Sequence, residues 1–385
     1  MNVARLIARN TMRHPLRSSL TVLGLAIAVM AFIVIRTSIA SWYAGAEAAS
    51  PNRLVTINAV SMVFTLPLAY KERIARLEGV TGVSYAQWFG GTYVDPKNFF
   101  PQFAVDVNTY FDLYPEIVIP PDQKERLFAE RNAVLVGRKL ADRFGWSVGD
   151  AIRLTGTIYP GDWDFVIRAI YTGAEEITDE TLWFFHYDYL DERMRAEAAM
   201  RAAQVGSFVV RIADPARAAA ISDQIDSMFK NSLAETRTET EKAFQLGFVS
   251  MAGSIVFGLK IISILVIVII LLVLANTMVM TARERISEYA VMKTLGFRAF
   301  HIFGLIYGES LFIACLGGGL GILFAYPIQT LIAAGVSDFF PAVPIELLTI
   351  LWAFLAAVAV GLLAALFPAY KALRTPIVNG LRIID

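Results

Sequence analysis

The stretch from Ile261 to Ala282, IISILVIVIILLVLANTMVMTA, holds 22 residues and no charged side chain. As an α-helix it is roughly 33 Å long, and the hydrocarbon core of a membrane is about 30 Å thick. Three more apolar runs follow the same pattern, at residues 18–35, 302–334 and 347–370. The first run is longer than the ~7–15 apolar residues of a secretory signal, so we interpret it as a retained helix. The sequence therefore predicts four transmembrane helices.

The composition agrees with a membrane protein and argues against several other classes. Of the 385 residues 56% are hydrophobic, whereas soluble domains are about 45–50% apolar. The formal net charge is zero, which gives no electrostatic basis for binding nucleic acid. The single cysteine, Cys315, excludes an intramolecular disulfide, and the three histidines are too scattered to suggest a metal cluster. We therefore expect neither nucleic acid nor a metal as a ligand.

Basic residues near the spans predict the orientation in the membrane. They gather in the N-terminal segment, after the second span and in the tail: Arg5, Arg9, Arg13, Arg17, Arg283, Arg285, Lys293, Arg298, Lys371, Arg374 and Arg382. The segment between the last two spans, residues 335–346, has no Lys or Arg. Because cytoplasmic loops carry the excess of basic residues, both termini are predicted to be cytoplasmic. Most of residues 42–257 then lie outside.

The large outer segment has the pattern of an α+β domain. Short β-branched or aromatic runs bounded by turn residues predict strands at 54–60, 103–107, 133–136 and 208–212. Helical spacing of apolar residues predicts helices at 68–77 and 216–229, and a hairpin is expected from 151–154 and 165–171. Residues 235–258 contain few helix breakers, so we expect a helical stalk that runs into the second span. A flexible linker is the alternative.

The segment after the second span is the most informative for function. Residues 282–295 fit one amphipathic helix, because Ile286, Tyr289 and Ala290 recur at helical spacing. The charged residues gather on the other face, where water or a partner protein can reach them. Gly296 follows at the position of a C-terminal cap. On these grounds the segment is a short helix at the inner membrane surface, and an ordinary solvated connector is the alternative.

Motifs in this segment and elsewhere resemble one family. The loop carries Arg285-Ile-Ser-Glu288 and Lys293-Thr-Leu-Gly296, preceded by Asn276-Thr-Met278. Three further stretches fit the same pattern in the same order: the beginning at 10–24, the outer segment at 134–141 with 148–150, and the end at 368–382. Together these motifs resemble the MacB/LolC/FtsX-type permeases of ABC transporters. The resemblance covers the architecture from end to end.

The resemblance implies a subunit that is not itself an enzyme. Such permeases dimerise, with a second copy or a paralogue, and bind a cytoplasmic ABC ATPase that holds ATP and Mg²⁺. This sequence contains no Gly-Lys pair and hence no phosphate-binding loop, and 17 residues precede the first run, so the ATPase is expected on another polypeptide. The residues that match the family's coupling loop, and are expected to contact the ATPase, are Glu284, Arg285, Glu288, Lys293 and Gly296.

The expected function is the conversion of ATP-driven movement into movement of the outer domain. The cargo is expected to be an amphiphile such as a lipid, lipoprotein, peptide or drug, with a periplasmic adaptor and an outer-membrane protein as further partners. An FtsX-like regulator of periplasmic cell-wall hydrolases is the main alternative, and a scaffold without an ATPase is a weaker one. The protein is expected in the bacterial inner membrane with a periplasmic domain.

The expected organisation, in chain order, has nine parts. They are a cytoplasmic amphipathic segment (1–17), the first span (18–41), a MacB-like periplasmic core domain with stalk (42–257), the second span (258–282), the coupling helix (283–300), the third span (301–334), a short periplasmic loop (335–346), the fourth span (347–370) and a cytoplasmic tail (371–385).

Charges and glycines near the spans give further candidate sites. Arg9, Arg13 and Arg17 are four residues apart, so they could bind acidic lipids or serve only to set topology. Glu309 lies about 10–12 Å into the third span, where it is expected to pair with a basic residue of 283–293 or to extend to the interface. Small residues that permit close helix packing cluster in the third span, at Gly317, Gly318, Gly319 and Gly321. Packing within one subunit is expected, and a dimer seam is the alternative.

Overall fold

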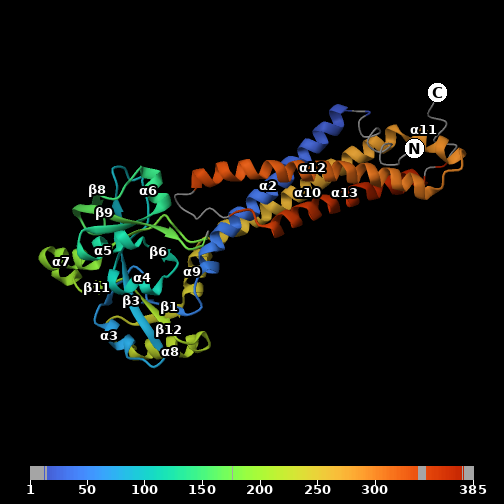
Figure 1. Cartoon of the computed structure of the whole chain (residues 1–385). Coiled ribbons are helices and arrows are strands. Elements are labelled where there is room, and N and C mark those ends of the chain that lie inside the picture. Colours follow the sequence, from blue (N-terminus) through green and yellow to red (C-terminus); the bar gives the residue numbers. More distant parts are fainter. Residues whose placement is uncertain (1–12, 14, 176, 337–343, 375, 377–385) are drawn as a thin grey trace. The chain divides into compact units, whose positions relative to one another are not determined.

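A computed structural model describes the chain except for residues 1–12, 14, 176, 337–343, 375 and 377–385. The chain divides into two compact units (Figure 1). One is formed by residues 1–40, 253–335 and 343–385, and the other by residues 41–252 and 336–342. We describe each unit by itself.

The first unit is a bundle of helices. Four of them are long and apolar enough to cross a membrane: α2 (Pro15–Ala48), α10 (Gly253–Glu284), α12 (Ala299–Val336) and α13 (Leu347–Arg374). A fifth and short helix, α11 (Ile286–Thr294), lies between α10 and α12 in the sequence. The prediction of an all-α transmembrane part with four helices is therefore confirmed.

Glycines in α12 allow its neighbours to approach closely. A Cβ on Gly317 would lie 2.8 Å from the side chain of Leu25, and one on Gly321 would lie 2.6 Å from the carbonyl oxygen of Ala26, so both glycines pack on α2. A Cβ on Gly318 would lie 3.1 Å from Ala357 of α13. Gly319 faces open space in the single chain, so it takes no part in packing between these helices, and the alternative of a dimer seam stays a prediction. One residue in a helix turn necessarily points away from a bundle in which its neighbours are buried.

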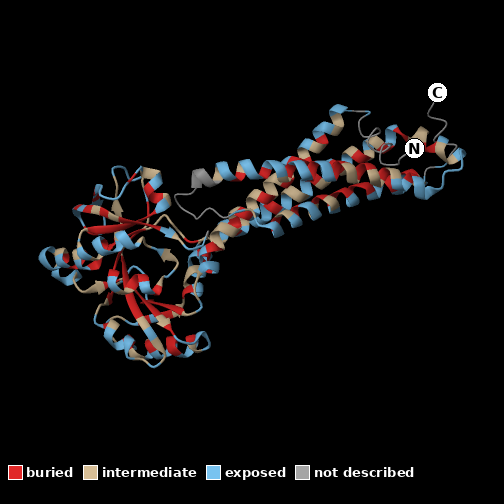
Figure 2. Cartoon of the chain, in the orientation of Figure 1, coloured by how far each residue is buried: buried red, intermediate tan, exposed pale blue. Residues whose placement is uncertain are grey.

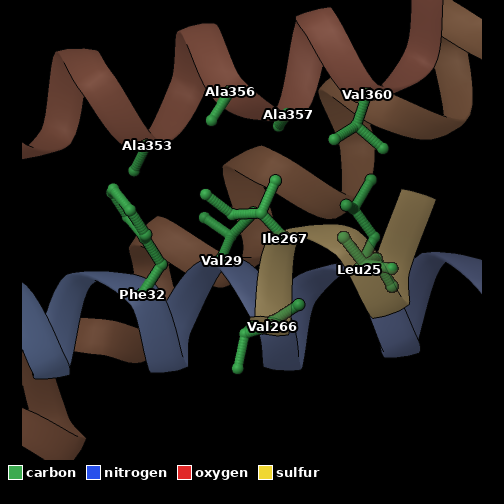
Figure 3. Close-up of a pocket in the computed structure, with 11 residues that line it drawn as sticks. Leu25, Val29, Phe32, Val266, Ile267, Ala353, Ala356, Ala357 and Val360 are labelled. Carbon is green, nitrogen blue, oxygen red and sulfur yellow. The ribbon is translucent and has the colours of Figure 1, made fainter. Parts of the chain in front are cut away.

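A small apolar cavity of about 20 Å³ lies between α2, α10 and α13. Figure 3 shows Phe32 and Val29 of α2 pointing toward Ala353 and Ala357 of α13. The cavity is lined by Leu25, Ala28, Val29, Phe32, Val266, Ile267, Ile270, Ala353, Ala356, Ala357 and Val360, all of which are apolar. Water has no hydrogen-bond partner among these side chains, so the cavity is suited to remain dry.

The second unit is an α+β domain built on one mixed sheet. The strands run in the order β13-β1-β12-β3-β5-β10-β7-β9-β8-β4, and β6 pairs with β9. The β10–β5 and β7–β9 pairs are parallel and the other pairs are antiparallel. The strands are β1 (Arg53–Asn58), β3 (Val80–Trp88), β4 (Gly91–Thr92), β5 (Gln102–Val105), β6 (Ile117–Val118), β7 (Ala133–Gly137), β8 (Ala151–Gly156), β9 (Gly161–Gly173), β10 (Trp183–His186), β12 (Ser207–Ile212) and β13 (Thr236–Thr240). A separate small sheet pairs β2 (Leu66–Pro67) with β11 (Gln204–Val205).

Short helices cover the sheet. They are α3 (Tyr70–Ala75), α4 (Val107–Leu113), α5 (Pro121–Ala129), α6 (Arg138–Phe144), α7 (Tyr187–Glu197), α8 (Ala218–Met228) and α9 (Glu241–Met251), with two 3₁₀ turns at Ala199–Arg201 and Pro215–Arg217. Much of the sheet is buried (Figure 2): every residue of β1, β7 and β10 is buried, whereas β8 alternates between buried and exposed residues. The core is rich in aromatic side chains, and the fully buried ones include Trp163, Trp183, Phe165 and Phe185.

The predicted strands and helices of this domain are found with ends that differ by a few residues, and the α+β class is confirmed. The predicted helical stalk over residues 235–258 is wrong in its first part. Residues 236–240, with the sequence TRTET, form β13 and pair with β1, because alternating threonines suit a strand at a sheet edge. The helix α9 begins only at Glu241, where the Thr240 side chain accepts a hydrogen bond from the Ala243 amide.

Candidate functional site

The short helix α11 is the best candidate site in the bundle. The sequence analysis expected one helix over residues 282–295, but α10 continues to Glu284 and α11 begins at Ile286. The helix breaks at Arg285, whose side chain extends into the bundle. The expected end of the helix is present, since Gly296 takes the left-handed conformation with φ of 87° and the Phe297 amide bonds to the Met292 carbonyl.

Arg285 lies between two carboxylates. Its Nη1 donates to Glu309 Oε2 at 2.9 Å, and its Nε donates to Glu288 Oε2 at 3.1 Å. The side chains of Arg285 and Glu309 are only 11% and 8% exposed. Because the loss of one partner would leave the other as an uncompensated buried charge, the two charges stabilise each other. The expected pairing of Glu309 with a basic residue of 283–293 is therefore present, and the alternative of extension to the membrane interface does not hold.

Two arginines before α2 and in its first turn bind the same region. Arg17 forms two parallel hydrogen bonds to Glu284, at 2.7 and 2.8 Å, and Arg13 donates to Glu288 at 2.6 Å. Arg9, the third basic residue of the expected lipid-binding face, lies outside the described residues. The charges of this segment do not all face outward: Arg285 is buried, whereas the side chains of Glu284 and Glu288 are 36% and 39% exposed. Pairing with opposite charges offsets the loss of hydration of the buried group, and the contact of the exposed charges with a partner stays a prediction.

These six side chains form what we name the α11 cluster: Arg13, Arg17, Glu284, Arg285, Glu288 and Glu309. It holds three positive and three negative charges and joins α2, α10, α11 and α12. Burial by itself raises the pKa of the Glu288 carboxyl, but hydrogen bonds from Arg285 and Arg13 outweigh it and hold this pKa below its usual value. The cluster is therefore charged near neutral pH on its exposed side.

Lys293 connects α11 to the fourth long helix. Its ammonium group donates to the carbonyl oxygens of Ala372 and Leu373, at 3.0 and 3.1 Å. The last carbonyls of a helix lack partners within the helix and attract positive charge, so Lys293 caps the end of α13. Through the α11 cluster and Lys293, one nine-residue helix is bonded to Arg13 just before α2, to α12 and to α13, and it is adjacent in sequence to α10.

Several large apolar side chains are exposed in the segment beside α11, where Arg298 is exposed as well. Leu295 and Phe300 are 72% and 78% exposed, and Val291 and Phe297 are also exposed. We name these four side chains the turn surface. The sequence analysis missed them, because it looked for charges as the contact with a partner. The signal that could have found them is a run of large apolar residues in the short connection between two spans.

The described residues contain no group of three or more His, Cys, Asp or Glu side chains that could hold a metal ion. Cys315 is a free and exposed thiol on α12. The α11 cluster holds helix ends together through ion pairs, and its exposed pairs are weak and screened by salt.

Comparison with known proteins agrees with this architecture. Residues 18–228 match the family of the MacB-like periplasmic core domain, and residues 260–377 match the FtsX-like permease C-terminal family. The first match alone covers more than half of the chain. The chain therefore belongs to the ABC transporter permeases of the MacB/FtsX type, and is a membrane protein with an extracytoplasmic domain.

Two curated relatives have names of the same kind. An uncharacterized ABC transporter permease protein of Mycobacterium tuberculosis is 23% identical over 65% of this chain and 29% of its own length. The pyoverdine export ATP-binding/permease protein PvdT of Pseudomonas entomophila is 30% identical over 38% of this chain and 20% of its own length. The chain thus spans less than a third of either relative.

Among solved structures, the periplasmic region of MacB from Actinobacillus actinomycetemcomitans is similar to 52% of this chain and 94% of its own length. Its sequence identity is 9% and its TM-score is 0.38.

Proposed function

We propose that this permease receives the ATP-driven movement of a cytoplasmic ABC ATPase at α11 and passes it to the extracytoplasmic domain. The observation that carries the proposal is the bonding of one short helix to the other helices of the bundle. Arg285 and Glu288 link α11 to Glu309 and Arg13, while Lys293 links it to the end of α13. A displacement of α11 would therefore act on several spans at once.

The first long helix offers a path for this movement. Arg17 in its first turn is bonded to Glu284 at the end of α10. The helix α2 then runs without interruption from Pro15 to Ala48, and Arg53 begins the first strand of the outer domain. A continuous helix transmits an axial displacement along its length because its backbone hydrogen bonds are all internal. The proposal is thus a mechanical one and needs no polar pore.

We assign the ATPase contact to the turn surface more than to the charges. Val291, Leu295, Phe297 and Phe300 are exposed, whereas the charged residues of α11 are engaged in the chain. Exposed apolar side chains in one short segment are typical of a protein interface. The ATPase, on its own polypeptide, would supply the ATP and Mg²⁺ site. A second permease copy or paralogue would complete the complex, and a periplasmic adaptor and an outer-membrane protein would extend it.

The buried residues of the spans support an amphiphilic cargo. Among the described residues, the buried charges of the bundle are Arg285 and Glu309, and they neutralise each other. A route for a polar solute generally requires a set of interior charged groups. We therefore propose that the cargo is a lipid, lipoprotein, peptide or drug that is moved at the outer leaflet or beyond it. The inner membrane of a bacterium is the proposed location, with both termini cytoplasmic.

Affinity purification of the tagged protein from its own host in mild detergent tests this function. We expect an ATP-binding protein to co-purify with the wild type and to be lost with Leu295→Asp. Val118→Asp, at an exposed apolar position of the outer domain, is the matched control and should retain it. Recovery of no ATP-binding protein with the wild type would contradict the proposal. Recovery of cell-wall hydrolases in place of cargo or adaptor proteins would favour an FtsX-like regulator.

A further inference from the structure

The outer domain contains a second buried arginine that the proposed function does not use. Arg53 is the first residue of β1, and its side chain is 5% exposed. Its Nε donates to Glu241 Oε2 at 2.7 Å, and its Nη2 and Nη1 donate to the two oxygens of Glu116 at 2.5 and 3.0 Å. Nη1 also donates to the Leu113 carbonyl at 2.9 Å, and the guanidinium lies 4.2 Å from the ring centre of Tyr114. We name Arg53, Glu116 and Glu241 the Arg53 cluster.

The cluster joins the two places where the chain enters and leaves the domain. Arg53 lies five residues after the end of α2, and Glu241 is the first residue of α9, which precedes α10. The carboxylate of Glu241 also accepts a hydrogen bond from the Ser50 amide, at 2.9 Å. Behind the cluster, β1 pairs with β13, so the incoming and outgoing strands are neighbours. Arg53 therefore fixes the incoming segment to the outgoing segment.

The third member of the cluster belongs to the other half of the sheet. Glu116 directly precedes β6, which pairs with β9, and its carbonyl accepts a hydrogen bond from the Ala174 amide just after β9. The sheet joins this half to β1, β12 and β3 through the β3–β5 pair, whose register extends from Ala86↔Val105 to Trp88↔Phe103. That junction is short. The bond from Arg53 to Glu116 is a further connection between the halves, beside the bonds of Lys71 to Asp106 and of Thr109 to Ser84.

An arginine suits this position for a geometric reason. The guanidinium has five donors in a fixed planar fork, so one side chain can hold two carboxylates and a carbonyl at set angles. Stability alone does not explain the group, because apolar side chains of similar volume often stabilise a core as well as or better than a buried ion pair. The role that the fork fits, and that apolar packing would not supply, is to fix the directions of three chain segments.

We propose that Arg53 is a positioning residue that ties the incoming segment, the outgoing segment and the far half of the sheet to one point. The domain then moves as one body when movement enters along α2 or α9. This inference rests on the proposed function only for the source of the movement. The rigid connection itself can be measured without an ATPase.

The test uses the full-length chain in lipid nanodiscs with Cys315 replaced by Ala. Spin labels are placed on exposed helix positions in the two halves, at Asp223 of α8 and Glu125 of α5, and the distance distribution is measured by pulsed electron spin resonance. We expect one narrow distribution in the wild type and a clear broadening in Arg53→Met. Arg168→Met is the matched control, because it removes an arginine–glutamate pair with Glu130 that does not join the halves, and should leave the distribution narrow.

Two further variants guard against a simple failure to fold. Glu116→Gln keeps the size of the side chain and removes the negative charge and one of the two acceptor oxygens that face Arg53. It should therefore broaden the distribution at an unchanged far-ultraviolet circular dichroism spectrum. A disulfide between Gly45→Cys and Gln245→Cys should hold the incoming and outgoing segments together again in Arg53→Met, since a Cβ on Gly45 would lie 3.4 Å from the end of the Gln245 side chain. The disulfide should restrict the motion of α9 and leave the distance distribution between the two halves broad.

A narrow distribution in both Arg53→Met and Glu116→Gln would overturn the inference, whatever the ATPase does. Failure of the proposed function would look different. In that case the wild-type distribution would still be narrow and would broaden on loss of Arg53, but no ATP-binding protein would co-purify.

Discussion

The two arginines that are buried among the described residues have neighbours of the same kind but different surroundings. Arg53 in the outer domain and Arg285 in the bundle each lie between two glutamates. In the Arg53 cluster one partner, Glu241, is 6% exposed and the other is mostly covered. In the α11 cluster Glu288 is 39% exposed and is shared with Arg13, which is 54% exposed.

This difference separates a fixed connection from an exchangeable one. Two buried charges interact strongly, and water cannot solvate one of them when its partner is lost. Exposed ion pairs contribute ~0–1 kcal/mol and are screened by salt. The Arg53 cluster is therefore suited to hold segments in place. The α11 cluster combines a buried pair, Arg285 and Glu309, with exposed pairs that can open and close during a transport cycle.

The largest expected effect is the loss of Arg53. Arg53→Met leaves Glu116 and Glu241 without their shared counter-charge in a poorly hydrated site. Breaking a buried pair in this way costs about 3–5 kcal/mol. Urea unfolding of the full chain in nanodiscs, followed by tryptophan fluorescence, should show this loss for the outer domain. A change below about 1 kcal/mol, the value for exposed pairs, would remove the basis of the comparison.

A pair of variants of intermediate effect tests the two sides of the α11 cluster. Glu309→Gln removes the buried charge that faces Arg285 and should cost about 1.5–3 kcal/mol, whereas Glu288→Gln should cost less than about 1 kcal/mol. Thermal unfolding of the purified protein, monitored at low and high salt, checks both values. The effect of Glu288→Gln should vanish at high salt. Equal losses of unfolding free energy in the two variants would mean that the buried and exposed pairs of the cluster do not differ in strength.

The packing of α2 on α12 should matter for the α11 cluster as well, since Arg13 and Arg17 reach it from that helix. Gly321→Ala would place a methyl group 2.6 Å from the Ala26 carbonyl oxygen and 2.7 Å from Val29. Overpacking of this kind costs about 1–3 kcal/mol. Gly319→Ala meets no atom within 4 Å and is the matched control. Thermal unfolding of the two variants should differ, and equal melting temperatures would contradict the packing.

The smallest expected effect is a pH dependence that belongs to neither cluster. Burial lowers the pKa of His186 below its usual 6.5, and a hydrogen bond between its Nε2 and the Leu127 carbonyl only partly opposes this shift. The unfolded chain then binds more protons than the folded chain between the lowered pKa and 6.5. The free energy of unfolding of the outer domain should therefore fall as the pH decreases through that interval. Above the interval the contribution of neutral His186 is fully present. His186→Gln should flatten this slope in urea unfolding at a series of pH values, and an unchanged slope would assign it to other groups.

Much of the fold could be predicted from the sequence because its signals are local. The run 261–282 has no charge, and the short apolar run 133–136 is bounded by turn residues. Spans and strands can therefore be predicted from short windows of sequence. The stretch 236–240 was misread because an edge strand depends on its partner, β1, which lies far away in the sequence. Propensity alone could not place it.

The candidate site was predicted less well, for a similar reason. The motif residues Glu284, Arg285, Glu288 and Lys293 were found, but their partners Arg13, Arg17 and the Ala372 carbonyl lie 79 to 275 positions away. The Arg53 cluster gave no signal at all, since a single arginine before an apolar strand does not reveal two distant glutamates. Long-range charge pairing is a property of the folded chain, and one sequence contains no record of it.

The central claim is that the turn surface beside α11 receives the ATPase, and crosslinking in living cells tests it most directly. A photoreactive amino acid is placed at Phe300 of the turn surface and, as a control, at Met200 of the outer domain, which is 96% exposed. We expect a crosslink from position 300 to an ATP-binding protein, identified by mass spectrometry, and none from position 200. The absence of a crosslink from position 300 to an ATPase would contradict this assignment. An equally strong crosslink to the ATPase from position 200 would contradict it as well.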